Sequence, residues 1–321
     1  MQSVHDEAVS DGAAIVDLAL VRHSRPAPSS QATSTLSAIP RAMRPTQWIK
    51  NGVLLAGLVF GGKLMDWGAV GAALYAVACF CLLSSGFYLL NDVRDESADR
   101  LHPQKRLRPV ASGELSRGVA MGVGIGLTGI ALAASLLLGP AFLVATLAYA
   151  GLMAAYNVGL KEVVIVDVLA IALGFVIRAA AGAIAVNVSV SPWLLLCTLL
   201  LAMLIGFGKR RDELLILENA SLHRRNLESY SWQMLDQAVA ITAAATLIAY
   251  AVYTFEADTV PRDLRMMVTI PLVAFGVFRY LHILYRRGGG GAPETLLLTD
   301  KALLAVIALW GLACVGIAYF G

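Results

Sequence analysis

The sequence predicts an all-α membrane protein in which about nine transmembrane helices form a bundle around a central cavity. Hydrophobic residues make up 58% of the 321 residues, and charged residues make up only 15%. The mean hydropathy is +0.71, so the chain carries more apolar side chain than one soluble core of this length needs. The apolar residues are also grouped into stretches of roughly 20, the length that an α-helix needs to cross a bilayer.

The apolar stretches follow one another to the end of the chain. Their approximate cores are 47–62, 68–90, 118–138, 141–158, 163–186, 192–208, 234–255, 266–285 and 301–320. If the spans alternate in direction, the second connection (about 91–117) and the sixth (about 209–233) lie on one side and are long and dense in charge. We expect the chemistry in these two connections, because functional residues gather on loops that a rigid scaffold positions.

The first 40 residues differ from the rest, because they are polar and rich in Ser, Ala and Pro. They lack the basic segment followed by an apolar segment that marks a secretory signal. We therefore expect residues 1–40 to form a flexible cytoplasmic tail and residues 41–321 to form the transmembrane domain.

Lys and Arg residues are distributed unevenly between the connections, which predicts the orientation of the chain. The N-terminal region and the two long connections are rich in them, whereas the opposite connections hold only Lys63, Arg262 and Arg265. Because positively charged connections stay in the cytoplasm, we expect the N-terminus inside and the C-terminus outside. The net charge of +3 then reflects topology and gives no reason to expect nucleic-acid binding.

Three carboxylates lie at the end of the second span. No Pro or Gly follows Gly86 in this segment, so the helix is expected to continue past Asn91. Spacings of three and then four residues put Asp92, Asp95 and Asp99 on one helix face, where like charges repel. A cation between them would relieve the repulsion, and Mg²⁺ is usually held by one or two carboxylates together with substrate phosphates. A solvated acidic helix end is the alternative.

A basic turn follows the acidic helix, with Lys105 and Arg106 between two prolines. Cationic side chains beside carboxylates suit a Mg²⁺-bound diphosphate. Neutralising the pyrophosphate that leaves is most of the catalysis needed when a carbon–oxygen bond to a diphosphate breaks. The sequence therefore predicts a Mg²⁺-dependent site for a diphosphate substrate.

These segments resemble the UbiA superfamily of intramembrane prenyltransferases. The pattern Asn-Asp-x-x-Asp-x-x-x-Asp at 91–99 is similar to the first acidic motif of that superfamily. The pattern Tyr-Asn-x-x-Leu-Lys at 156–161 is similar to its Tyr-x-x-x-x-Lys element after the fourth span. The resemblance covers about residues 40–321 and implies a UbiA-type bundle of nine spans. The residues that it implies are Asp92, Asp95 and Asp99 for Mg²⁺ and catalysis, and Asn91, Tyr156 and Lys161 for substrate binding.

Four further segments are closer to one branch of the superfamily, the decaprenyl-phosphate phosphoribosyltransferases. They lie at 44–51, 102–109, 208–214 and 227–230. This resemblance implies transfer of 5-phosphoribosyl from phosphoribosyl diphosphate to a polyprenyl (decaprenyl) phosphate, with release of pyrophosphate, for the synthesis of cell-envelope glycan precursors. It also implies an integral protein of a bacterial cytoplasmic membrane, in contact with lipids. The oligomeric state is left open, a homo-oligomer included.

The sixth connection departs from the usual superfamily pattern, in which a second Asp-rich motif holds another Mg²⁺. Here the basic run Lys209, Arg210 and Arg211 precedes Asp212 and Glu213. Phosphoribosyl diphosphate carries a 5-phosphate besides its diphosphate, and we expect Lys209 and Arg210 to contact it. Glu213 is expected in the same substrate site. The alternative is that the basic run only marks the membrane boundary.

Two more basic residues are candidates for substrate binding. Arg178 falls near the middle of the fifth span, where a charge costs at least about 2.5 kcal/mol and should face protein, a cavity or an anion. Asp167 lies eleven residues earlier on the same helix face, so a structural pairing of either residue with a neighbouring helix is an equal alternative. Lys50 begins the first span, where phosphate binding or snorkelling to lipid headgroups would account for it.

Two rival functions stay open on the sequence. A prenyltransferase acting on an aromatic acceptor, in quinone, haem or chlorophyll synthesis, would share the Mg²⁺ site and differ in the acceptor pocket. A membrane transporter would place ionisable residues along a path through the midplane, whereas here most of them gather at one face.

Overall fold

The structure, a computed structural model, describes residues 35–320 except 103, 218–228, 258–263, 288–295 and 297–298. The α-helices are α1 Thr35–Ala42, α2 Ala56–Phe60, α3 Trp67–Arg94, α4 Glu96–Leu101, α5 Arg117–Ser135, α6 Pro140–Val158, α7 Val166–Ala185, α8 Pro192–Leu217, α9 Trp232–Glu256, α10 Ile270–Arg287 and α12 Lys301–Phe320. The 3-10 helices are η1 Pro45–Leu55, η2 Lys105–Leu107, η3 Leu136–Leu138, η4 Leu160–Glu162 and η6 Arg265–Thr269. Most of the expected tail, together with Arg262 and residues 227–228, lies outside the described residues.

Eight of the described helices are long and apolar enough to cross a membrane, and they coincide with the predicted stretches from 68–90 onward. The first predicted stretch, 47–62, forms η1 and α2 end to end. Their 11 and 5 residues, at about 2.0 and 1.5 Å of rise each, give about 30 Å, which is the thickness of the hydrocarbon core. The prediction of an all-α membrane bundle of about nine spans is thus confirmed, and the chain is an integral membrane protein.

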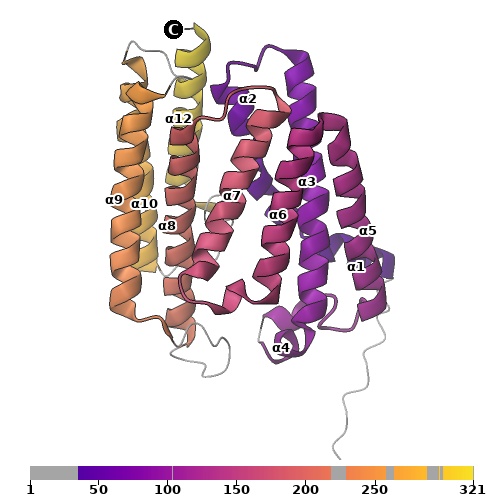
Figure 1. Ribbon diagram of the computed structural model, residues 1–321. Helices are drawn as coiled ribbons and strands as arrows, with labels where there is room; N and C mark the ends of the chain where they lie inside the picture. The colour runs from indigo at the N-terminus through magenta and orange to yellow at the C-terminus, as the bar shows by residue number, and fades with distance from the viewer. Residues whose placement is uncertain are drawn as a thin grey trace, which may run out of the picture.

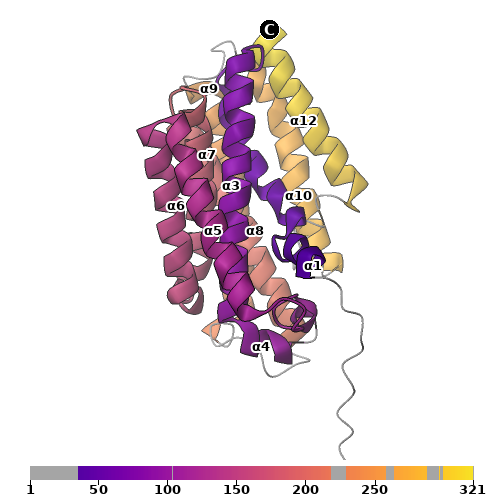
Figure 2. The same ribbon diagram turned by 90° about the vertical axis from the view of Figure 1, so that its right-hand side faces the viewer.

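The helices run side by side in one bundle (Figure 1). α4 lies at one end of the bundle, which we call the α4 end, and the C-terminus lies at the other (Figure 1). Figure 2 shows α5 and α6 on one side of the molecule and α10 and α12 on the other. Between these sides α7 packs against α8, while α3 packs against α5 and α8 packs against α9.

Each of the two sides of the bundle has a buried hydrophobic cluster of its own. On the first side, the ring of Phe80 on α3 lies 5.9 Å from that of Phe142 and 5.3 Å from that of Tyr149, both on α6. On the second side, Leu204 on α8 and Leu235 on α9 are buried in a cluster that also takes in residues of α7 and α10. α7 contributes to both clusters, so it is the helix that joins the two sides.

Glycines bring the first span into backbone contact with α7. A Cβ added to Gly182 would lie 1.9 Å from the Leu54 carbonyl oxygen, and one added to Gly57 would lie 2.6 Å from the Cα of Ala183. Small residues allow such close approach of helices within a membrane. The contact fixes η1, which carries Lys50, against α7.

Candidate active site

The acidic segment bends where α3 ends. α3 ends at Arg94, Asp95 occupies the junction with φ −89° and ψ 6°, and α4 begins at Glu96. Backbone hydrogen bonds continue across the bend, from the Asp95 N–H to the Asn91 carbonyl (2.8 Å) and from the Asp99 N–H to the Asp95 carbonyl (2.8 Å). The helix expected to run on past Asn91 is therefore a pair of helices that meet at Asp95.

Asp92 and Asp99 are buried and share an arginine. Arg108 Nη1 donates to Asp99 Oδ2 at 2.6 Å and to Asp92 Oδ1 at 3.2 Å. Arg44 also donates to Asp92 Oδ1, and its guanidinium lies 5.1 Å from the ring centre of Tyr88. Asp92 Oδ2, by contrast, is buried and has no hydrogen-bond partner in the described part of the chain. A buried oxygen of this kind is costly, and a bound cation would satisfy it.

Contacts to α3 position Arg44. The hydroxyl of Ser85 on α3 donates to the Met43 carbonyl at 3.0 Å and accepts from Trp48 Nε1 at 3.0 Å. Arg44, between these two residues, has φ 54° and ψ 62°, a left-handed conformation that is uncommon outside glycine. The connection from α1 to η1 is thus fixed on both sides of Arg44, and the guanidinium is held at Asp92.

Asp95 has a partner of its own. Lys161 Nζ on η4 donates to both oxygens of Asp95, at 2.6 and 2.9 Å. The Asp95 side chain is 29% exposed, against 1% for Asp92 and 5% for Asp99, so Asp95 is the most accessible of the three carboxylates. Nearby, Arg94 Nη2 donates to the Val158 carbonyl at the end of α6 at 2.8 Å. The structure therefore brings the predicted Lys161 to the predicted acidic motif.

The basic residues of the run on α8 differ in how deeply they are buried. Arg210 is only 2% exposed, and its Nε donates to Asp167 Oδ2 at 2.6 Å. It also donates to Glu213, one turn further along α8. The hydroxyl of Tyr230 donates to the other oxygen of Asp167 at 2.7 Å. Lys209 and Arg211 are both half-buried, but Arg211 Nε donates to Asp236 Oδ1 at 2.6 Å, so Lys209 has the freer approach to a phosphate.

Arg178 is buried on the first side of the bundle, and it does not pair with Asp167. Its Nε donates to Asn51 Oδ1 at 2.9 Å, and its Nη2 donates to the Tyr149 hydroxyl at 2.5 Å. The guanidinium also stacks 4.6 Å from the Tyr149 ring centre and 5.2 Å from that of Phe175. Within the described residues Arg178 makes no ion pair, so neutral groups and ring faces solvate its charge.

The other predicted substrate residues lie on four different elements. They are Asn91 on the last turn of α3, Lys50 on η1, Lys105 and Arg106 on η2, and Tyr156 near the end of α6. Arg106 is exposed, whereas the other four are half-buried.

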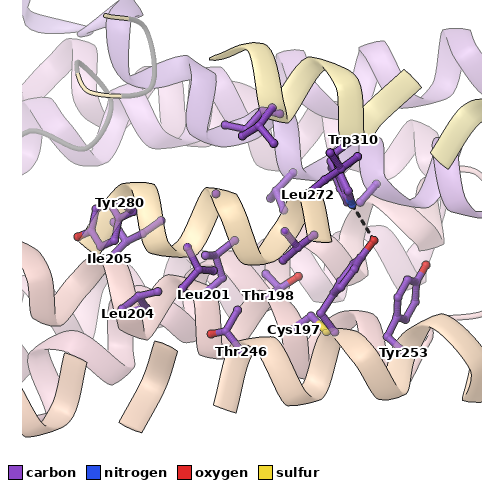
Figure 3. Close-up of a pocket in the computed structure, with 18 of the residues that line it drawn as sticks. Cys197, Thr198, Leu201, Leu204, Ile205, Thr246, Tyr253, Leu272, Tyr280 and Trp310 are labelled. Carbon is purple, nitrogen blue, oxygen red and sulfur yellow. Dashed lines mark hydrogen bonds between the residues drawn. The ribbon is translucent and has the colours of Figure 1, made fainter. Parts of the chain in front are cut away.

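An apolar cavity of about 400 Å³ lies on the second side of the bundle, lined mainly by α8, α9, α10 and α12 (Figure 3). Figure 3 shows Tyr280 at one end of it and Trp310 towards the other. Trp310 Nε1 donates to the Tyr250 hydroxyl at 2.7 Å. The Tyr280 hydroxyl is buried without a partner among the described residues and lies against Gly208, where an added Cβ would be 2.1 Å away. One end of the cavity thus adjoins the start of the basic run.

The donor set fits a hard cation that also binds substrate. Within the described residues, no three His, Cys, Asp or Glu side chains are arranged to hold a metal ion by themselves. Zinc sites commonly use three or four protein ligands, whereas Mg²⁺ uses one or two carboxylates plus substrate phosphates. Asp92, through its unpartnered Oδ2, and the half-buried Asp95 are the carboxylates that suit this role. Asp99 gives Oδ2 to Arg108, as Asp92 gives Oδ1, and its predicted part in Mg²⁺ binding stays a prediction.

Sequence reasoning missed the partners of these carboxylates. Arg44 and Arg108 both lie in segments that carried the resemblance, at 44–51 and 102–109, but nothing in their spacing shows which basic residue turns towards Asp92. Tyr230 lies in the segment 227–230 and was likewise without a role. The segments were the available signal, and the contacts required the fold.

Comparisons with known proteins identify the family of this chain. Residues 52–209 match the UbiA prenyltransferase family. A decaprenyl-phosphate phosphoribosyltransferase of Corynebacterium glutamicum is 33% identical over 287 residues, covering 87% of this chain and 86% of that protein. A protein of the same name from Mycobacterium tuberculosis is 32% identical, covering 88% and 94%. The solved structure of a UbiA homolog from Archaeoglobus fulgidus bound to GPP and Mg²⁺ has a TM-score of 0.66 at 19% identity, covering 87% of this chain and 100% of that one. This chain therefore belongs to the UbiA prenyltransferase family.

Proposed function

We propose that this protein transfers a 5-phosphoribosyl group from phosphoribosyl diphosphate to a polyprenyl phosphate and releases pyrophosphate. The observation that carries the choice of reaction is the 33% identity, over 87% of the chain, to a decaprenyl-phosphate phosphoribosyltransferase. The acidic and basic residues at the α4 end supply a site for the diphosphate, and the apolar cavity supplies one for a lipid.

The reaction is a single displacement at the anomeric carbon of the ribose. An oxygen of the lipid phosphate bonds to that carbon while the bond from the carbon to the diphosphate breaks, and the electron pair leaves with pyrophosphate. The second pKa of a phosphate monoester is about 6, so the acceptor is already a dianion near neutral pH. The site therefore needs no strong general base, and its main task is to bind and neutralise negative charge.

Asp92 and Asp95 would hold Mg²⁺ on the diphosphate, with Asp99 assisting by orienting Arg108. Mg²⁺, when bound, supplies positive charge to the leaving diphosphate. The unpartnered Oδ2 of Asp92 supports this assignment, because one oxygen of that carboxylate already binds arginines while the other has no donor.

The cations around the acidic motif would bind phosphate oxygens. Lys161 and Arg108 now bind carboxylates, and their remaining N–H groups can bind the diphosphate at the same time. Lys105 and Arg106 on η2 add charge beside them, and we assign Lys209 to the 5-phosphate. Further substrate contacts are assigned to Lys50, Asn91, Tyr156 and Arg178, while Arg210 and Glu213 belong to the wall of the site.

The lipid acceptor would lie with its chain in the apolar cavity and its phosphate towards the α4 end. The cavity adjoins Gly208, directly before Lys209, so a phosphate at this end of the cavity would meet the basic run. We further propose that the protein lies in a bacterial cytoplasmic membrane with the α4 end facing the cytoplasm, where a soluble sugar diphosphate is available.

The direct test is a pair of assays on the purified protein with Mg²⁺. One offers labelled phosphoribosyl diphosphate and a polyprenyl phosphate, and the other offers a prenyl diphosphate and 4-hydroxybenzoate. We expect label in the lipid product and stoichiometric pyrophosphate from the first, and no product from the second. Prenylated 4-hydroxybenzoate without phosphoribosyl lipid would establish the aromatic prenyltransferase instead. Uptake of substrate into sealed vesicles without either product would indicate a transporter.

A further inference from the structure

We propose that Tyr230 is a positioning residue. It holds the strained turn of residues 159–165, directly before α7, and thereby keeps Lys161 in contact with Asp95. The proposal rests on the proposed function only in treating Lys161 as part of the working site. Its geometry stands on the hydrogen bonds of Tyr230 with Ile165 and Asp167, which the reaction itself does not explain, and on the ion pair of Lys161 with Asp95.

The turn before α7 contains a residue in an unfavourable conformation. Ile165, the last residue before α7, has φ 69° and ψ −44°. For a β-branched residue a positive φ is a true outlier, because the side chain and the preceding carbonyl crowd each other. Such a conformation persists only where the surroundings impose it. Something in the fold must therefore hold Ile165.

Tyr230 is the group that holds it. The Ile165 N–H donates to the Tyr230 hydroxyl oxygen at 2.7 Å, and the hydroxyl donates to Asp167 Oδ1 at 2.7 Å. The direction of the hydroxyl proton is fixed, because the amide can only donate and the carboxylate can only accept. Asp167 is fully buried, and its other oxygen accepts from Arg210 at 2.6 Å. Tyr230 is itself only 5% exposed.

The same turn carries Lys161. Its backbone is closed by hydrogen bonds from the Glu162 N–H to the Gly159 carbonyl (2.9 Å) and from the Asp167 N–H to the Val163 carbonyl (3.0 Å). At its far end, Arg94 binds the Val158 carbonyl at 2.8 Å. The turn is thus fixed at both ends, by α3 and by Tyr230. Relaxation of Ile165 to a negative φ would redirect the chain and draw Lys161 away from Asp95.

A second cluster at the same end of the bundle also joins an arginine, an aspartate and a tyrosine, but it lies apart from the turn before α7. Arg211 Nε donates to Asp236 Oδ1 at 2.6 Å, and the Tyr285 hydroxyl donates to the same oxygen at 3.1 Å. Tyr285 therefore matches Tyr230 as a tyrosine bound to an arginine-paired aspartate, but it does not contact Ile165. Tyr285→Phe is the matched control for Tyr230→Phe.

The first measurement follows the position of Lys161 and needs no enzyme activity. The full chain in detergent is treated with acetyl N-hydroxysuccinimide ester, and acetylation of Lys161 is timed by mass spectrometry, with Lys63 as the internal reference. Tyr230→Phe should raise the rate at Lys161 about tenfold, the change expected from one lost buried hydrogen bond. Tyr285→Phe should leave it at the wild-type rate. Adding Ile165→Gly to Tyr230→Phe should restore protection, because glycine adopts this φ without strain.

The second measurement asks whether Tyr230 acts through Lys161. Tyr230→Phe should lower kcat about tenfold and cause no further loss when Lys161→Gln is already present. Unchanged acetylation and kcat in Tyr230→Phe, or an equal loss with and without Lys161→Gln, would overturn the proposal.

If Tyr230→Phe alone does not fold, Ile165→Gly is compared with the double variant Tyr230→Phe, Ile165→Gly. A tenfold difference in the acetylation rate of Lys161 between these two variants overturns the proposal. A wild-type protein that protects Lys161 in this way but transfers no phosphoribosyl group would refute the proposed function and leave the positioning role intact.

Discussion

At the scale of single residues, the three carboxylates of the acidic motif bind basic side chains, and Asp99 binds Arg108. Asp92 binds Arg44 and Arg108, and Asp95 binds Lys161. Taking such charges out of water costs several kcal/mol per ion, and the attraction between them often returns no more than that cost. Stability alone is thus a weak reason to keep them. A site that must bind a multiply charged diphosphate gives a stronger one, because the bases are already in place when it arrives.

Asp92→Asn tests the metal assignment with little change of shape. Loss of one charge-assisted contact of about 1.5–3 kcal/mol should lower kcat/KM by about 10- to 150-fold and raise the Mg²⁺ concentration needed for half-maximal rate. Steady-state rates at a series of Mg²⁺ concentrations measure both effects. Asp236→Asn is the control, because it removes an ion pair with Arg211, a residue not assigned to the Mg²⁺-bound diphosphate, and should keep the wild-type Mg²⁺ dependence. A wild-type Mg²⁺ curve for Asp92→Asn would remove the assignment.

The site also shows where inference from sequence ends at this scale. The spacing of Asp92, Asp95 and Asp99 identified the acidic segment, because helical periodicity relates neighbours along one element. It could not identify Arg44 and Arg108 as partners, since Arg44 precedes the first span and Arg108 follows α4 beyond a turn, where helical periodicity no longer relates the positions.

At the scale of elements, long apolar stretches predicted their helices closely, and short segments did not. The stretch 118–138 corresponds to a span at Arg117–Leu138, because bilayer thickness fixes both length and composition. The first stretch contains Gly52 and Gly57 and follows Pro45, and it forms a 3-10 helix and a short α-helix. Hydropathy cannot foresee this, because the deviation depends on close contact with α7.

Gly182→Ala tests that contact. The added Cβ would lie 1.9 Å from the Leu54 carbonyl oxygen, so the backbones of η1 and α7 must separate. Overpacking of this kind costs about 1–3 kcal/mol, and we expect a lower unfolding temperature in detergent together with reduced activity. Gly126→Ala on α5 is the matched control, since no atom lies within 4 Å of its added Cβ, and alanine favours a helix over glycine. Equal unfolding temperatures for the two variants would show that η1 is not held by this contact.

At the scale of the whole molecule, the two ends of the bundle differ in charge. The acidic motif on α3 and α4 and the run Lys209 to Arg211 on α8 lie at one end of the bundle, which α4 marks in Figure 1. The opposite connections hold few basic residues, among them Lys63 and Arg265. This asymmetry was readable from the sequence, because it depends only on the order of spans and connections. The packing of the two sides around α7 was not, since it depends on which helix faces meet.

The same asymmetry predicts which way the protein crosses the membrane. Connections rich in Lys and Arg stay in the cytoplasm, so the α4 end should face inward, and the C-terminus, at the other end of the bundle, should face outward (Figure 1). A reporter that is active only outside the cytoplasm, such as alkaline phosphatase, should therefore be active when fused after Gly321 and inactive when fused before Met1. A fluorescent protein that matures only in the cytoplasm should give the opposite pattern at the two ends.

Cytoplasmic signal at both ends would mean that η1 and α2 do not cross the membrane, because the eight long helices alone would return the chain to the side on which it began. An inverted pattern would put the phosphate-binding residues outside, away from any soluble sugar diphosphate, and would refute the orientation on which the proposed reaction depends.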